Sequence, residues 1–179
     1  DFLKNLPKPW EKLGLEIVKY NNSAESVICA NFETFPVDTQ YTIVRSSHSM
    51  EHALNPRLFL NKMIDLAAAG GIIVLLSPNA NCLEYKILGK CWLPLNIPSH
   101  FCLLDCQSAV TYLVNRGCDV IYKKTYTLFS FSGSLLDWLG VRRLRVIFSL
   151  ALNVILLPIT VFGLLIGRGD SFAIYARKK

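Results

Sequence analysis

The sequence has 179 residues, enough for one domain with its own core, and 52% of them are hydrophobic. Its net charge of +6 is unevenly spread: residues 1–139 hold 12 basic and 12 acidic side chains, whereas residues 140–179 hold seven basic ones and one acidic one. A nucleic-acid-binding protein more often spreads its basic residues over a folded face, so we expect no nucleic acid as partner.

The six cysteines form no C-x-x-C pair and no zinc-finger spacing, and most of them lie inside apolar segments. This pattern is typical of reduced, buried thiols and favours a cytoplasmic location. The residues are Cys29, Cys82, Cys91, Cys102, Cys106 and Cys118.

The first third of the chain predicts three short strands. Residues 1–12 are typical of the end of a helix broken by Pro7 and Pro9. Residues 13–18 predict a strand ending near Glu16, residues 19–26 a short helix or loop, and residues 26–32 and 41–47 two further strands.

The middle of the chain predicts helices and strands in alternation. Apolar residues recur at the helical period in residues 55–71, with Gly70 and Gly71 as the stop, and residues 72–79 predict a strand covered on both faces. A helix over residues 105–117, capped by Asp105 and ended by Gly117, precedes a long strand over residues 119–131. This alternation predicts an α/β fold with a parallel sheet.

Ligands of such sheets bind outside the carboxyl ends of the strands. Polar residues follow the predicted strands at Glu16, at Asn31, from Ser46 to His52, and from Ser77 to Asn79. We therefore expect a binding or catalytic site at this edge.

The segments "LGLEI", "ANFETFP", "YTIVRSSHSMEHALNPRLFL", "AAAGGIIVLLSPNAN", "GKCWLPLNIPSHFCLLD" and "NRGCDVI" together resemble the class I S-adenosylmethionine-dependent methyltransferases. The branch that they resemble includes methyltransferases of quinone biosynthesis and of bacterial cell-surface glycan pathways. The resemblance implies a Rossmann-like, mostly parallel sheet with an antiparallel last strand, "SFAIYARKK". It divides the chain into a partial core (1–132), an apolar helical insertion (133–169) and the last strand (170–179).

The glycine-rich loop that cradles the cofactor in this family is missing from the sequence. The opening "DFLKNL" resembles the helix that follows that loop, so we expect a fragment that lacks a central strand and is itself inactive.

The resemblance assigns S-adenosylmethionine as cofactor and names the residues that bind it. Glu16 would bind the ribose diol, Asn31 and Phe32 the adenine, and Ser46 and Ser47 would lie beside the cofactor. From the residues alone, Glu16 could equally be a surface carboxylate, Phe32 a core side chain and Asn31 a turn residue.

The stretch "RSSHSMEH" holds two of the three histidines of the chain, and His100 follows in "NIPSHF". His48, Glu51, His52 and His100 could bind a divalent ion, with three imidazoles favouring zinc, iron or manganese over magnesium. Alternatively, one imidazole is a general base, with His48, His52 and His100 as the catalytic candidates. The third interpretation is structural: Glu51 and His52 cap a helix, and His100 bonds to backbone.

The segment "GKCWLPLNIPSH" resembles a substrate loop of the family, in which Trp92 and Pro98 would shape the acceptor pocket. Trp92 could also be an ordinary core residue.

Residues 146–167 carry no charge and, as one helix, would be about 33 Å long, enough to cross a bilayer. The last strand must return to the sheet, and arginines flank both ends, so we expect both ends on the cytoplasmic side. Because Pro158 divides the run, the sequence predicts a helical hairpin or paired interfacial helices that contact the membrane through residues 142–168. The alternative is a soluble helical lid.

These observations predict a methyltransferase at the inner face of the membrane, acting on an oxygen of a lipid-linked, glycan or quinone-type acceptor. The alternative function is a non-catalytic, membrane-associated module of the same fold.

Overall fold

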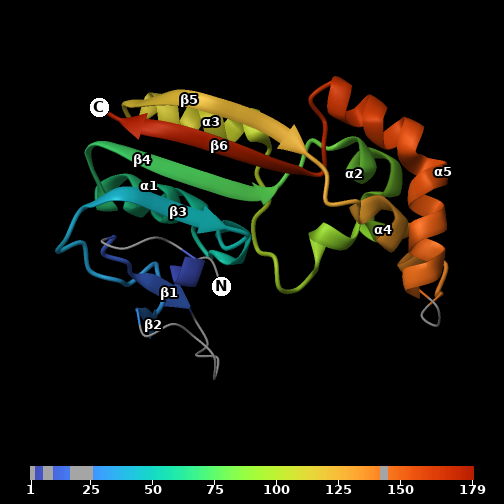
Figure 1. Cartoon of the computed structure of the whole chain (residues 1–179), viewed down its shortest axis with the longest axis horizontal. Helices are drawn as coiled ribbons and strands as arrows, with labels where there is room; N and C mark the ends of the chain where they lie inside the picture. The colour runs from blue at the N-terminus through green and yellow to red at the C-terminus, as the bar shows by residue number, and fades with distance from the viewer. Residues whose placement is uncertain (1–2, 6–9, 17–25, 142–144) are drawn as a thin grey trace. The chain divides into compact units, whose positions relative to one another are not determined.

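The computed structural model describes residues 3–5, 10–16, 26–141 and 145–179 (Figure 1). The chain divides into two compact units, residues 1–38 and residues 39–179. The segment 19–25, predicted as helix or loop, lies outside the described residues, as do Pro7 and Pro9.

The first unit contains a pair of short parallel strands. The turn η1 (Leu3–Asn5) precedes β1 (Gly14–Glu16), and β1 pairs in parallel with β2 (Val27–Cys29). A Cβ atom at Gly14 would lie 2.7 Å from a methyl carbon of Leu3, so a larger residue here would need the Leu3 side chain to move. The predicted strands therefore form at the predicted places.

The second unit contains a four-stranded mixed sheet in the order β3-β4-β6-β5. β3 (Tyr41–Ser47) and β4 (Ala67–Pro78) are parallel, and β6 (Ser171–Lys178) runs antiparallel to both β4 and β5 (Cys118–Tyr126). The sheet confirms the expected mostly parallel strands and the antiparallel last strand inserted beside β5.

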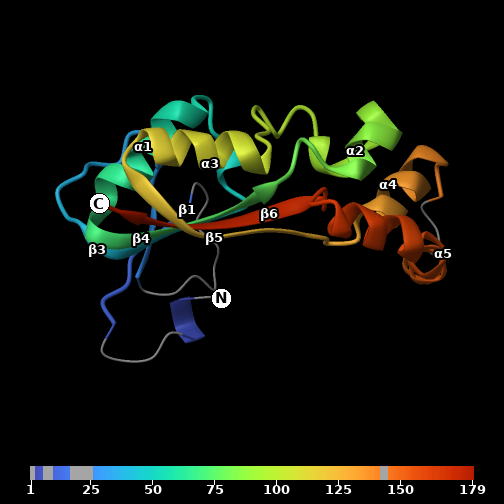
Figure 2. The same ribbon diagram turned by 90° about the horizontal axis from the view of Figure 1, so that it is seen from above.

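Two helices cover one face of this sheet (Figure 2). They are α1 (Pro56–Leu66), capped by Asn55, and α3 (Cys106–Asn115), capped by Asp105 as predicted. The burial of successive side chains along β4 alternates as a result. Ile73 and Leu75 are buried under the helices, whereas Ile72, Val74 and Leu76 are only half-buried. The prediction that this strand is covered on both faces is wrong for the described residues.

Two predicted boundaries differ from the structure. The helix expected to end at Gly70 ends at Leu66, because Ala67 pairs with Tyr41 and already belongs to β4. The strand expected to continue to Phe131 ends at Tyr126, because Phe129 adopts a left-handed conformation (φ 57°) and α4 (Ser130–Trp138) begins there.

The apolar segment forms one helix rather than two. α5 (Arg145–Leu165) continues through Pro158, although proline removes one backbone hydrogen bond from the helix interior. The expected break at Pro158 is therefore wrong, and the helical hairpin consists instead of α4 and α5, which pack against each other. The hairpin extends from the carboxyl edge of the parallel strands, beside α2 (Leu83–Leu88) (Figure 1).

A buried junction ties the hairpin to the sheet. Asn79, just after β4, donates a side-chain hydrogen bond to the Gly169 carbonyl oxygen (2.9 Å) and its own N–H to that of Asp170 (2.8 Å). The Asp170 carboxylate in turn accepts from the backbone N–H groups of Leu128 and Ser130. Both ends of the hairpin therefore start at the same corner of the sheet.

The cysteines are all free, but they are less uniformly buried than expected: Cys82 and Cys118 are buried, and Cys29 is exposed. Burial raises the pKa of the Cys82 thiol to about 12, so this thiol is unreactive at neutral pH.

Candidate functional site

Glu51 is the buried centre of the site at the carboxyl edge of β3 and β4. It lies in the turn η2 (Met50–His52) and is 1% exposed. Ser77, near the end of β4, donates its hydroxyl proton to Oε2 over 3.1 Å. Burial raises the pKa of the Glu51 carboxyl, but the hydrogen bonds from His48 and Ser77 and the charge of His48 outweigh it, so the pKa lies below its usual value. The carboxylate is therefore charged at neutral pH.

A long loop brings His100 to the same place. The Glu51 carbonyl oxygen accepts the backbone N–H of Phe101 (2.8 Å), which fixes the loop against η2. The rings of His52 and His100 then meet edge to face, with centroids 4.7 Å apart. Residues that are 48 positions apart in the sequence thus converge, as the sequence predicted.

Both imidazoles are oriented by backbone carbonyl groups. Nδ1 of His52 lies 2.9 Å from the Ser99 oxygen, and Nδ1 of His100 lies 2.6 Å from the Pro94 oxygen. A carbonyl oxygen only accepts, so both Nδ1 atoms carry the proton. In the neutral ring Nε2 is then unprotonated, and its lone pair is available to a proton or an ion.

His48 contacts the cluster formed by Glu51, His52 and His100 through its Nδ1 atom and Glu51. Its backbone is left-handed (φ 52°), and its N–H bonds to the Leu76 oxygen over 2.9 Å, continuing the pairing of β3 with β4. Its Nδ1 lies 3.3 Å from Oε1 of Glu51. His48 is thus placed to hold the Glu51 carboxylate, and its predicted catalytic role stays a prediction.

Three residues of this cluster have the chemistry of a metal site. One ligand atom from each of Glu51, His52 and His100 lies within 4.8 Å of the others. Two imidazoles and a carboxylate suit zinc, and Nδ1–H bonded to a carbonyl is the usual orientation of a metal-binding histidine. Ligand atoms of tetrahedral zinc lie about 3.4 Å apart, so the three side chains would have to move closer together to bind one ion.

Ser46 and Ser47 end β3 next to the cluster. The Ser46 hydroxyl is buried and makes no hydrogen bond within the part of the chain that the structure describes. A buried hydroxyl without a partner costs about 1–3 kcal/mol, so a bound ligand is a natural partner for it. Ser47 is half-buried, and its carbonyl oxygen accepts the hydroxyl proton of Ser49.

The residues assigned to ribose and adenine lie together in the first unit. Glu16 is the last residue of β1, and its carbonyl oxygen accepts the N–H of Ala30 over 3.0 Å. Asn31 and Phe32 follow directly, and the Asn31 side chain accepts the N–H of Glu33 over 2.8 Å. The carboxylate and the Asn31 turn thus share one edge of the β1–β2 pair.

The two predicted substrate residues lie in different surroundings. Trp92 is fully buried, packs against Tyr85 and donates its indole N–H to Ser130 over 3.3 Å, as expected of a core residue. Pro98 is exposed in the turn that carries Ser99 and His100. Its pocket role, like that of Trp92, stays a prediction.

A second buried carboxyl group, Glu84, is not among the residues predicted from the sequence. It lies in α2 and accepts the hydroxyl proton of Ser130 at the start of α4, 46 residues away in the chain. Burial raises the pKa of Glu84 to about 7; the hydrogen bond from Ser130 opposes this rise, and the charge of Asp170 adds to it. Because these groups come from α2, from the start of α4 and from the residue before β6, no local pattern in the sequence indicates the cluster.

The Glu84→Gln variant is expected to lose a pH dependence of stability. The pKa is raised from 4.5 to about 7 in the folded protein, so the folded state binds more protons and wild-type stability falls as pH rises through this window, by about 3 kcal/mol. Gln stays uncharged at every pH, so the stability of the variant relative to wild type should rise between pH 5 and pH 8. Urea denaturation at pH 5 and at pH 8 measures this difference in the free energy of unfolding. The exposed Asp65→Asn change is the control, and equal pH profiles for wild type and Glu84→Gln would contradict the prediction.

No match to the sequence was found among protein-family models or curated protein sequences. The fold, however, resembles solved structures. One is a SAM-dependent methyltransferase from Archaeoglobus fulgidus, with 18% identity, a TM-score of 0.53, and 93% of this chain and 75% of that chain covered. Another is a putative methyltransferase from Bacillus halodurans, with 19% identity, a TM-score of 0.50, and coverages of 88% and 74%.

A third similar structure is the mycolic acid cyclopropane synthase CmaA1 in complex with SAH and CTAB, with 16% identity, a TM-score of 0.51, and coverages of 85% and 60%. The present chain spans 55 to 75% of the length of the structures it matches. The chain thus has the Rossmann-like fold of class I methyltransferases. A methyltransferase and a cyclopropane synthase share this fold, so the reaction must be argued from the site.

Proposed function

We propose that the chain belongs to an S-adenosylmethionine-dependent methyltransferase that methylates an oxygen of a lipid-linked, glycan or quinone-type acceptor. The observation that carries the proposal is the pair of imidazoles at the carboxyl edge, each with Nδ1–H fixed to a carbonyl oxygen and Nε2 available. In sheets of this class the ligand lies at that edge.

The proposed step is an in-line displacement. The acceptor oxygen attacks the methyl carbon, the carbon–sulfur bond breaks, and sulfur keeps the electron pair, which leaves S-adenosylhomocysteine. Nε2 of His52 takes the hydroxyl proton, and the nearby Glu51 carboxylate stabilises the imidazolium that forms. His100 packs edge-on against His52 and holds its ring in place.

The same residues could hold a divalent ion. Glu51, His52 and His100 would be its ligands, and the ion would lower the pKa of the acceptor hydroxyl. Dialysis against a chelator separates the two roles: a rate restored only by zinc or manganese assigns the residues to metal binding, and an unchanged rate assigns His52 as the base.

Binding of the cofactor tests the proposal. The complete gene product carrying these residues is expected to bind S-adenosylmethionine in calorimetry, and Glu16→Ala should weaken binding at least tenfold, because the ribose hydroxyls lose their carboxylate partner. Glu11→Ala, which removes an exposed carboxylate of the first unit, is the control. The proposal also requires label transfer from methyl-labelled cofactor to a membrane extract; absence of both binding and transfer would refute it.

A further inference from the structure

The polarity of α5 is inverted relative to a helix of a soluble protein. Three hydrophilic side chains interrupt its sequence between Phe148 and Leu165, and all three lie on one side at helical spacing: Ser149, Asn153 and Thr160. This side faces the protein, where Ser149 meets Ser132 of α4 at 2.9 Å between hydroxyl oxygens. A soluble amphipathic helix turns such a stripe to water.

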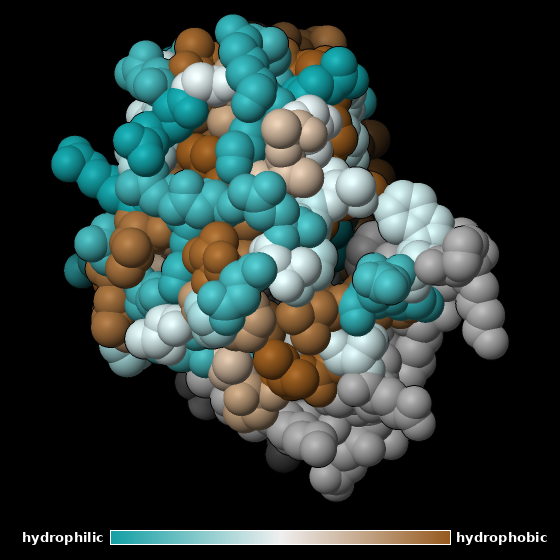
Figure 3. All heavy atoms as spheres, turned by 90° about the vertical axis from the view of Figure 1, so that its left-hand side faces the viewer, coloured by the Kyte–Doolittle hydropathy of each residue, from teal (hydrophilic) through white to brown (hydrophobic). Residues whose placement is uncertain are grey.

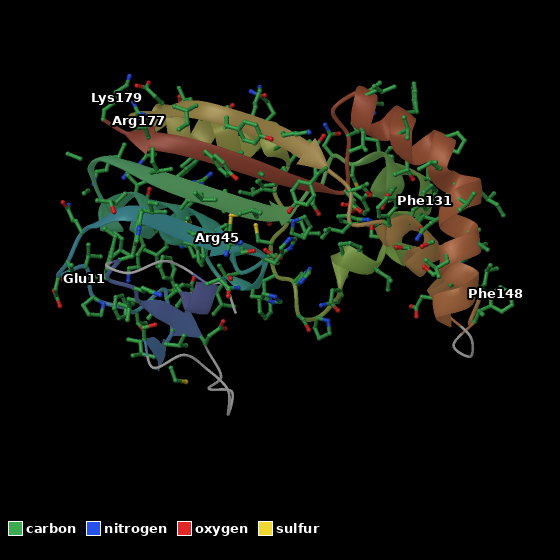
Figure 4. All side chains as sticks on the ribbon, in the orientation of Figure 1. Glu11, Arg45, Phe131, Phe148, Arg177 and Lys179 are labelled. Atoms are coloured by element: carbon green, nitrogen blue, oxygen red, sulfur yellow. The ribbon has the colours of Figure 1, made fainter. Side chains whose placement is uncertain are left out.

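The opposite side of α5 is apolar and exposed. Nine hydrophobic residues of α5 and the turn after it are between 41 and 79% exposed. They are Phe148, Leu150, Val154, Ile155, Leu157, Val161, Phe162, Leu165 and Ile166. Figure 4 shows Phe148 on the side of α5 that points away from the sheet. Phe148–Leu165 is long and apolar enough to cross a membrane, and only 11% of it is buried, unlike a core helix of a soluble protein.

A full crossing conflicts with the sheet. β6 follows α5 and pairs with β5, which precedes α4, along its whole length. Both ends of the hairpin also meet at Asp170, which binds the N–H groups at the start of α4. The two ends of the hairpin segment therefore remain on one side of any membrane.

The charges around α5 favour anionic lipid over a second copy of the chain. Three arginines stand at or before its start, Arg168 follows its end, and residues 138–169 contain no acidic residue. If two copies paired through α5, a basic end would meet a basic end in either orientation, which is unfavourable. A phospholipid surface instead offers apolar tails to the exposed side and phosphates to both ends.

We infer that the α4–α5 hairpin inserts its exposed side into one leaflet of an anionic phospholipid bilayer. The hairpin lies in the interface with both ends at the headgroups, and it does not span. Away from the hairpin, Lys179 at the end of β6 and Asp119 in β5 form an exposed ion pair at 3.0 Å, and Figure 3 shows hydrophilic residues among hydrophobic ones on this side. Such exposed charges remain in water when the hairpin lies in the membrane.

This docking also brings the candidate site close to the membrane. Ser77, which binds Glu51, is two residues before Asn79, and Asn79 binds the backbone at the base of the hairpin. An acceptor with a lipid anchor could then present its polar head to the cluster without leaving the bilayer. This second step rests on the proposed function, whereas membrane docking does not.

Vesicle flotation tests the docking. The complete gene product is expected to float with phosphatidylcholine vesicles containing one-third phosphatidylglycerol, less with phosphatidylcholine alone, and the difference should shrink at high salt. The double change Val154→Gln and Ile155→Gln should lower the partition coefficient at least tenfold, because two largely exposed side chains no longer enter the leaflet. The double change Leu150→Gln and Leu165→Gln alters exposed side chains at other turns of α5 and should weaken partition in the same way.

The matched control is Val114→Gln, which changes an exposed valine of α3 and should leave flotation unchanged. Because the altered side chains are exposed, the thermal midpoints of both α5 variants should stay near that of wild type. The inference would be overturned if wild type failed to float, or if both α5 variants floated as well as wild type. It would also be overturned if wild type formed a dimer in vesicle-free solution that these variants dissociate. Flotation with neither cofactor binding nor methyl transfer would refute the proposed function and leave the docking intact.

Discussion

His52→Ala should lower the rate of methyl transfer by about 10²- to 10⁴-fold while leaving the affinity for S-adenosylmethionine unchanged. In the proposed mechanism this ring is the general base: its Nδ1 is fixed to the Ser99 carbonyl oxygen, its ring packs edge to face against His100, and one of its ligand atoms lies within 4.8 Å of a Glu51 carboxylate oxygen. The measurement is label transfer from methyl-labelled cofactor to a membrane extract, beside calorimetry of cofactor binding.

Two further measurements separate catalysis from structure. Imidazole added to the medium should partly restore the activity of His52→Ala if the ring serves as base, and a structural role would not respond to it. Ser99→Ala keeps the carbonyl group that orients His52 and should keep full activity. If His52→Ala retained wild-type transfer, the assignment of the base would be wrong.

Much of the fold could be predicted from local patterns. Strands followed from short apolar runs between turn residues, and α3 followed from its period and its Asp105 cap. The errors arose where tertiary pairing outweighs local preference: "AAAGG" continues a helical pattern, but Ala67 pairs with Tyr41. Pro158 predicts a break, yet α5 continues through it with the loss of one backbone hydrogen bond.

The candidate site was only partly visible in the sequence. The spacing of His48, Glu51 and His52 within one turn indicated a cluster, and the loop to His100 completed it. Glu84, Ser130 and Asp170 gave no such signal, because each comes from a different element and they meet only after the hairpin has folded back. Buried polar groups that join distant elements are the part of a site that local patterns miss.

Glu51→Ala is expected to lower the free energy of unfolding at pH 7 by about 3 kcal/mol. The change leaves the buried Ser77 hydroxyl without its acceptor and His48 without its carboxylate, and it opens a void. The pKa of Glu51 is lowered in the folded protein, so its ionised form stabilises the fold above pH 4.5, and this contribution is lost as pH falls below that value. The cost of Glu51→Ala should therefore shrink on acidification.

Urea denaturation at pH 7 and near pH 3.5 measures this trend, with Glu51→Gln as the matched variant. Gln keeps the size of the side chain and an acceptor for Ser77, so it should cost less than Ala at pH 7 and show a similar decrease with acidification. A carboxylate that only caps the turn η2 would contribute about 1 kcal/mol to the free energy of unfolding. In that case Glu51→Ala and Glu51→Gln would cost nearly the same. A large, pH-dependent cost instead requires a buried charge that the fold keeps ionised, which is the condition for Glu51 to stabilise an imidazolium or bind an ion.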